Sequence, residues 1–250
     1  MAARPAVRPR RGRPDRLCLR ILALDTTGSR ESVALLDTGG GGVAGEVRIT
    51  APDAHSQRVL PAVSFLLESL GLAPLDVGAY AVAVGPGSFT GVRVGISTVQ
   101  GLALASGRRC LGVPTLDALA ARAAGAAPRL VAMIDGFRED VFAAVYDADG
   151  RPAGQPLVAP PERVLEQVPA GPAAFVGDGA ERYRARILEV RPDALFPARS
   201  LFLASAVAAL AAPRLERGEG VPPGQLRPLY LRAADIRPPA PGPALSRRPT

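Results

Sequence analysis

Glycine-rich turns carry the residues whose chemistry is most informative in this sequence. The first, Asp25-Thr26-Thr27-Gly28, follows an apolar run and places a carboxylate beside two hydroxyls and flexible amides. Such a turn can hold a phosphate and the water shell of its Mg²⁺. The same residues also suit an ordinary tight turn closed by Asx and Ser/Thr hydrogen bonds, and the turn alone favours that structural interpretation.

A second turn interrupts the chain after the apolar run at 80–84. Gly85-Pro86-Gly87 and Ser88 precede a glycine-spaced helix that is expected to begin near Gly91. A strand, a glycine loop and a helix start can cradle an anion. The loop lacks the Lys of a Walker A motif, and its spacing is one residue too long for a dinucleotide fingerprint. A third glycine turn, Gly177-Asp178-Gly179, follows the apolar run at 173–176. The three turns together give the candidate nucleotide-binding residues, which are Asp25, Thr26, Thr27, Gly28, Gly85, Gly87, Ser88, Gly177, Asp178 and Gly179.

The helix that follows the second turn has an unusual spacing of small residues. Gly87, Gly91 and Gly95 are four apart, so they share one side of a helix and make it smooth. A smooth side lets another backbone approach closely, and the preceding helix at about 55–70 is apolar at helical spacing. These features predict a partner-binding surface made of His55, Val59, Val63, Leu66, Gly87, Gly91, Val94, Gly95 and Thr98.

Charge and composition exclude several functions. The net charge is +7, but residues 1–20 carry +6 and 227–250 carry +4, which leaves −3 on the segment between them. A direct RNA-binding surface on that body is therefore not expected. The chain has no Lys and a single His, so neither Schiff-base chemistry nor a two-His metal site can be built. We assign no catalytic residue and no metal ligand.

The two cysteines do not make a disulfide framework, and no apolar run approaches the length of a membrane span. A signal peptide is also missing from the start of the sequence. We therefore expect reduced thiols, a cytoplasmic location and no membrane partner.

Periodicity predicts two similar α/β halves. Each half begins with a strand that ends in Asp, at 22–25 and 131–135, and each later has a glycine-bounded turn from strand to helix. The division predicted is an Arg/Pro-rich arm (1–16), an N-terminal domain (17–124), a C-terminal domain (125–212) and a Pro-rich irregular tail (213–250). The elements expected are strands at 17–24, 32–37, 43–50, 80–84, 110–113, 130–135, 140–146 and 173–176, and helices at about 55–70, 91–105, 115–124 (N-cap Thr115), 162–167, 180–190 and 200–211.

Several stretches, in order, resemble the TsaB (YeaZ) family of bacterial tRNA threonylcarbamoyladenosine proteins. They are ILALDTTGSRESVALL, HSQRVLPAVSFLLESLG, VGPGSFTGVRVGISTVQGLALA, LGVPTLDALA, FVGDGAERY and PLYLR, and together they cover about 17–235. The resemblance implies an α/β, actin-like (ASKHA, ribonuclease-H-like) fold of duplicated domains, with mixed sheets flanked by helices. It also implies a relationship to TsaD, the catalytic subunit.

TsaD-type chains carry a metal-binding His-x-x-x-His where this sequence has Thr115 and Leu119. The resemblance therefore implies a non-catalytic subunit that binds a TsaD-like subunit. A TsaE-like ATPase is a further candidate partner. The chain is expected to form a homodimer when the TsaD-like subunit is absent, and to contact tRNA mainly through the complex. No tightly bound cofactor is expected, and ATP or ADP with Mg at the partner interface is a candidate. The alternatives are a stand-alone actin-like ATP-dependent kinase that uses Asp25 and the glycine turns and, remotely, a peptidase.

Overall fold

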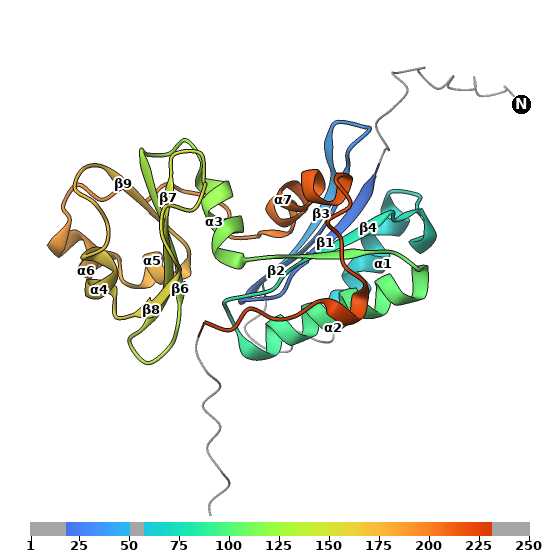
Figure 1. The fold of residues 1–250 in the computed structure, drawn as a ribbon, viewed down its shortest axis with the longest axis horizontal. Helices are drawn as coiled ribbons and strands as arrows, with labels where there is room; N and C mark the ends of the chain where they lie inside the picture. The colour runs from blue at the N-terminus through green and yellow to red at the C-terminus, as the bar shows by residue number, and fades with distance from the viewer. Residues whose placement is uncertain (1–18, 51–57, 232–250) are drawn as a thin grey trace, which may run out of the picture.

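A computed structural model describes residues 19–50 and 58–231 and contains two mixed β-sheets with helices against them (Figure 1). Within these ranges no helix is both long enough and apolar enough to cross a membrane. The predicted arm at 1–16 and the end of the predicted tail, 232–250, lie outside the described residues, as does His55.

The first sheet has the strand order β3-β2-β1-β4-β5. Its first three strands form an antiparallel meander, and the last two are parallel to β1. The strands are β1 (Arg20–Asp25), β2 (Arg30–Asp37), β3 (Gly42–Thr50), β4 (Ala79–Ala83) and β5 (Cys110–Val113).

Helices cover both faces of this sheet. Along β1 the side chains alternate, so Leu22 and Leu24 face α1 (Val59–Ser69) and α2 (Phe89–Ser106) in one cluster. Ile21 and Ala23 face α7 (Ala204–Glu216) in another cluster. Burial on both faces explains why the strand reads as a continuous apolar run.

The second sheet has the order β8-β7-β6-β9, with β9 parallel to β6. Its strands are β6 (Arg129–Asp135), β7 (Val141–Asp147), β8 (Leu157–Ala159) and β9 (Ala173–Val176). One face packs on α4 (Pro161–Leu165), α5 (Asp178–Arg182) and α6 (Arg184–Val190).

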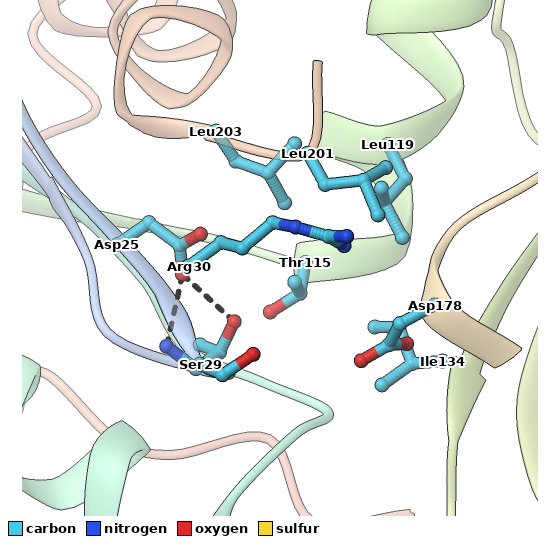
Figure 2. Close-up of a pocket in the computed structure, with 11 residues that line it drawn as sticks. Asp25, Ser29, Arg30, Thr115, Leu119, Ile134, Asp178, Leu201 and Leu203 are labelled. Atoms are coloured by element: carbon cyan, nitrogen blue, oxygen red, sulfur yellow. Dashed lines mark hydrogen bonds between the residues drawn. The ribbon is translucent and has the colours of Figure 1, made fainter. Parts of the chain in front are cut away.

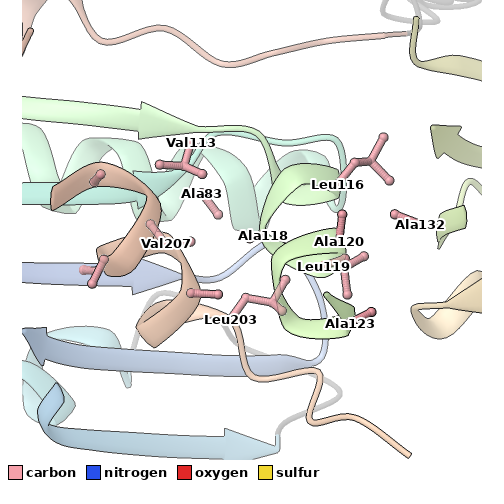
Figure 3. Packing of buried hydrophobic residues seen from close by; sticks show 14 of the residues in the cluster. Ala83, Val113, Leu116, Ala118, Leu119, Ala120, Ala123, Ala132, Leu203 and Val207 are labelled. Atoms are coloured by element: carbon pink, nitrogen blue, oxygen red, sulfur yellow. The ribbon is translucent and has the colours of Figure 1, made fainter. Parts of the chain in front are cut away.

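The helix α3 (Thr115–Ala123) lies between the two sheets (Figure 1). Its side chains meet β6 on one side and α7 on the other, in a single apolar cluster that spans both sheets (Figure 3). Ala118, Ala120 and Ala123 are fully buried there, and their small side chains allow close approach.

Some predicted elements are wrong in detail. The expected helix at 180–190 is two short helices, α5 and α6, and Thr115 is the first residue of α3 after the N-cap Pro114. The chain is not irregular from Pro213, because α7 continues through it to Glu216. The short helices η2 (Pro74–Asp76) and η3 (Pro223–Gln225) and the strand β8 were not expected.

The predicted domain boundaries remain a prediction, but α7 packs on the first sheet although 200–211 was grouped with the second half. Residues distant in sequence therefore complete the first unit.

The smooth side of α2 packs against the β1–β2 turn. The hydroxyl of Thr26 donates a hydrogen bond of 2.6 Å to the carbonyl oxygen of Gly91, and Ser88 N donates to the carbonyl oxygen of Thr27 at 2.7 Å. A Cβ added at Gly87 or Gly91 would overlap the carbonyl oxygen of Thr27 or of Thr26, respectively. A Cβ at Gly95 would come within 2.5 Å of Thr26 Oγ1.

The prediction that these glycines face a partner is therefore wrong, because their side of α2 is occupied by the chain itself. Val59, Val63 and Leu66 were also predicted to face a partner, but they lie on the side of α1 that is buried in the core. Val94 and Thr98 of α2 are half-buried.

Replacing Gly91 with Ala tests this packing. The matched control is Gly101→Ala in the same helix, where an added Cβ would meet nothing within 4 Å. We expect Gly91→Ala to lose ~3 kcal/mol or more of unfolding free energy, because neither backbone can yield to the methyl group. Gly101→Ala is expected to gain about 0.5–1 kcal/mol from helix propensity. Urea denaturation measures both, and equal stability of the two variants would contradict the assigned contact.

Candidate functional site

Asp25 ends β1 and is almost fully buried, with 2% of its surface exposed. One of its carboxylate oxygens accepts hydrogen bonds from Thr27 N at 3.0 Å and from Thr27 Oγ1 at 2.7 Å. Burial raises the pKa of Asp25 to about 6, against the lowering effect of the two Thr27 hydrogen bonds and with a further rise from Glu31. The carboxyl is thus held rigidly in a desolvated position.

Asp178 lies in the second half of the chain, at the start of α5 and directly after β9. Its Oδ1 accepts from Asp135 N at 3.0 Å and from Gly179 N at 2.8 Å. Burial raises its pKa, and the hydrogen bonds from Asp135 and Gly179 oppose the rise. The flanking glycines again permit close packing, because a Cβ at Gly177 would overlap the carbonyl oxygen of Met133.

A small cavity brings the two carboxyl groups together (Figure 2). Its volume is about 40 Å³, and its lining residues come from both sheets and from α3. In Figure 2 the hydroxyl of Thr115 points into the space between Asp25 and Asp178. The lining residues are Asp25, Thr27, Gly28, Ser29, Arg30, Thr115, Leu119, Ile134, Asp178, Leu201 and Leu203.

Four of the predicted nucleotide-binding residues therefore meet at this cavity, namely Asp25, Thr27, Gly28 and Asp178. The other six, Thr26, Gly85, Gly87, Ser88, Gly177 and Gly179, do not line it. Ser88 instead caps α2, accepting a hydrogen bond of 3.3 Å from Gly91 N.

Sequence reasoning missed Ser29, Arg30, Ile134, Leu201 and Leu203. It named Thr115 as a cap and, with Leu119, as a position where TsaD-type chains carry a metal-binding His, but it did not place either residue beside Asp25 and Asp178. Arg30 follows the Asp25 turn, and its Nη2 donates to Glu181 Oε2 of α5 at 3.2 Å, which ties the first sheet to the second. No local pattern identifies Leu201 or Leu203, since they reach the cavity from the segment before α7.

The size of the cavity limits its chemistry. A volume of 40 Å³ holds a few water-sized groups, at roughly 10–15 Å³ for each, whereas ligand pockets for drug-sized molecules are roughly 300 Å³ or more. In this conformation the cavity does not admit a nucleotide. The described residues also contain no group of three His, Cys, Asp or Glu side chains placed to hold a metal ion.

Comparison with known proteins assigns a family to this arrangement. The family model described as TsaD, tRNA N6-adenosine threonylcarbamoyltransferase, matches residues 35–211. The solved structure of YeaZ from Pseudomonas aeruginosa is 39% identical, with a TM-score of 0.75, and the match covers 85% of this chain and 100% of that one.

Among curated proteins, the tRNA threonylcarbamoyladenosine biosynthesis protein TsaB of Escherichia coli is 41% identical over 133 residues, which are 52% of this chain and 56% of that protein. The chain thus spans about half the length of the curated relatives it matches.

The fold extends to more distant proteins. Component A of (R)-2-hydroxyglutaryl-CoA dehydratase from Acidaminococcus fermentans superposes with a TM-score of 0.51 at 10% identity, over 80% of this chain and 99% of that one. The expected α/β actin-like fold, with mixed sheets flanked by helices, is confirmed.

The buried carboxyl of Asp25 makes stability depend on pH. Its folded pKa of about 6 lies above the unfolded value of 3.8, so the folded protein binds this proton more tightly. Wild type should therefore gain stability, relative to Asp25→Asn, as the pH falls from about 7 to about 4. At about pH 8 the Asn variant is expected to be more stable by up to ~3 kcal/mol, because it removes a desolvated charge and keeps an acceptor for Thr27.

Urea denaturation in EDTA-containing buffer over this pH range measures the difference between the two proteins. Parallel stability curves would show that Asp25 is not the titrating group.

Proposed function

The chain belongs to the TsaB (YeaZ) family, and from this membership we propose that it is a non-catalytic subunit of a tRNA threonylcarbamoylation system. It binds a TsaD-like catalytic subunit, and the complex transfers threonylcarbamoyl to N6 of the adenosine next to the anticodon in ANN-decoding tRNAs. The support for a non-catalytic role is the small volume of the cavity, which has room for a few waters and is lined in part by the apolar side chains of Leu119, Leu201 and Leu203.

The observation that carries the proposed partner binding is the outer surface of α1 and α2. Phe65 of α1 and Leu104 of α2 are 63% and 76% exposed, and Leu60 is 52% exposed. A cleft of about 160 Å³ opens between the two helices, lined by Leu60, Ser64 and Leu102 among others. Exposed large apolar side chains beside a cleft favour a protein partner.

This surface, which we call the α1–α2 surface and define by Leu60, Ser64, Phe65, Gly101 and Leu104, replaces the glycine side that the sequence predicted. Gly101 has no side chain, so a partner can approach the backbone of α2 closely at this point. Nothing in the chain itself lies within 4 Å of a Cβ added there. A related helix pair on a TsaD-like subunit would complete a four-helix interface. The same surface serves a homodimer when that subunit is absent.

The proposal places nucleotide and tRNA on the complex rather than on this chain alone. The cavity is too small for ATP, so ATP or ADP with Mg²⁺ is assigned to the junction with the partner, where a TsaE-like ATPase also acts. The segment 21–226 has a net charge of −3, which disfavours direct tRNA binding by the body of the protein.

Binding to a TsaD-like subunit tests the proposed function. Phe65→Asp and Leu104→Asp are expected to weaken the dissociation constant at least ~10-fold each, because a charge then replaces an anchor that is buried in the complex. The variants should fold normally, since both side chains are exposed. Titration calorimetry with the purified partner, with and without ATP and Mg²⁺, measures the change, and a reconstituted assay measures tRNA modification.

Val190→Asp is the matched control, because Val190 is 58% exposed on α6 of the second sheet. The proposed interface fails if all three variants bind equally well. The proposed subunit role fails if the wild-type chain neither binds the partner nor supports modification of tRNA.

A further inference from the structure

Two aromatic rings lie half-exposed at the beginning of α2. Phe89 is the first residue of the helix and is 48% exposed, and Tyr230, from the segment that follows α7, is 44% exposed. The two rings are stacked, with their centroids 5.6 Å apart and an angle of 27° between their planes. The pair therefore offers flat aromatic surface to a ligand that can stack on it.

The guanidinium of Arg93 completes this cluster. Its Cζ atom lies 3.8 Å from the centroid of the Phe89 ring, and its Nε donates a hydrogen bond of 3.0 Å to the phenol oxygen of Tyr230. Within residues 19–50 and 58–231, no carboxylate forms an ion pair with this guanidinium. Its positive charge and its other N–H groups therefore remain for an anionic ligand.

The two segments that build the cluster carry no negative charge. Residues 77–116 and 220–234 contain Arg but neither Asp nor Glu. The sequence at 227–250, which includes Tyr230, has five Arg and one Asp. The acidic residues that give 21–226 its net charge of −3 thus belong to other segments. An aromatic cluster at the start of a basic sequence is complementary to a polyanion that carries flat rings.

Hydrogen bonds hold the cluster in place. Leu229 N donates to the carbonyl oxygen of Val84 at 2.8 Å. Gln100 Nε2 of α2 donates to the carbonyl oxygens of Pro223 and Leu226, at 3.0 and 3.2 Å. These bonds fix the segment that leads to Tyr230 against α2 and the end of β4. The ring stack is thus formed in the protein alone, so little conformational entropy is lost when a ligand binds.

We propose that Phe89, Arg93 and Tyr230 form a stacking platform for unpaired bases of single-stranded RNA. Bases stack on aromatic rings and guanidinium planes whatever their sequence, and nearby positive charge attracts the phosphates. The inference deepens the proposed function and rests on it for the choice of RNA as the ligand. In the complex, the platform would contact the unpaired bases of the tRNA anticodon loop.

The platform differs from the α1–α2 surface in position and chemistry. Phe89 precedes Leu104 by 15 residues, which is about 22 Å along α2. The exposed side chains of Leu60 and Leu104 are aliphatic, whereas the platform is aromatic and positively charged. These differences favour separate partners for the two surfaces, with a protein on the first and RNA on the second.

RNA binding by the full chain alone tests the platform without the partner subunit. The probes are a fluorescein-labelled single-stranded RNA decamer of mixed sequence and a duplex of the same sequence, both in ~50 mM NaCl. Fluorescence anisotropy should give a dissociation constant of ~10–100 µM for the single strand. The duplex should bind at least ~5-fold more weakly, because its bases are already paired and stacked on one another.

Arg93→Lys separates stacking from charge. Lys keeps the positive charge but has no planar group, so affinity for the single strand should fall at least ~5-fold with an unchanged salt dependence. Phe89→Leu and Tyr230→Ala should each weaken binding at least ~5-fold, because a stacking ring is lost. Phe137→Ala and Arg108→Ala, at exposed residues elsewhere, are the matched controls and should remain within ~2-fold of wild type. Urea denaturation checks that every variant is folded.

Tyrosine fluorescence reports on the platform directly. The chain has no Trp and four Tyr, of which Tyr80, Tyr146 and Tyr183 are at most 4% exposed, so Tyr230 is the accessible fluorophore. A base that stacks on the platform should quench this emission when the unlabelled single strand is added. Tyr230→Phe should abolish the quench and keep the affinity within ~3-fold of wild type, because Phe still stacks.

Two results would overturn the proposal. The first is the absence of binding to the single strand at chain concentrations up to ~0.5 mM. The second is equal affinity for single strand and duplex, unchanged in Arg93→Lys and Tyr230→Ala, which would assign RNA binding to general charge attraction. Both results leave the proposed function standing, because that function is decided by the separate measurements with Phe65→Asp and Leu104→Asp and the TsaD-like subunit.

Discussion

The contact between α2 and the β1–β2 turn constrains the rest of this structure. Two backbones approach so closely that the carbonyl oxygen of Thr26 occupies the position of a Cβ at Gly91. The hydrogen bond that Thr26 Oγ1 donates to Gly91 O fixes the orientation of the turn relative to α2. Because Thr26 is fixed in this way, Asp25 is held at the end of β1 and cannot turn toward solvent. The position of the buried carboxyl thus depends on glycines more than 60 residues away in sequence.

The second sheet uses the same physical solution. Gly177 and Gly179 allow the start of α5 to lie against the backbone of Met133 and Ile134, and Asp178 is then held by Asp135 N. The two carboxyl groups line the same cavity as Thr115, the first residue of α3. The buried alanines of α3 let the two sheets approach closely. Leu201 and Leu203 line the same cavity. The space that remains between the two sheets at this point is a cavity of about 40 Å³.

The sequence predicts local features of this fold well and distant contacts poorly. The apolar runs and turn residues at 32–37 and 173–176 place β2 and β9 to within two residues, since short apolar runs and glycine turns are local signals. The packing of α7 on the first sheet has no local signal, because an Ala-rich helix fits either sheet. Thr115, Arg30 and Leu201 meet at one cavity only through the tertiary arrangement of both sheets. The sequence could therefore identify Asp25, Thr27, Gly28 and Asp178 as candidates, but not the residues of other elements that meet them at the cavity.

The glycine spacing in α2 shows how a correct pattern led to a wrong partner. A spacing of four residues establishes that a backbone approaches that side, but it does not identify which backbone. The neighbouring apolar residues do contain this information. At about 100° per residue, Gly95 lies about 40° from Val99 and about 60° from Val92, both of which are buried, and Leu104 lies about 180° away. A helix on the surface of a domain has one buried side, so glycines on the apolar side meet the chain's own sheet, and the opposite side remains for a partner.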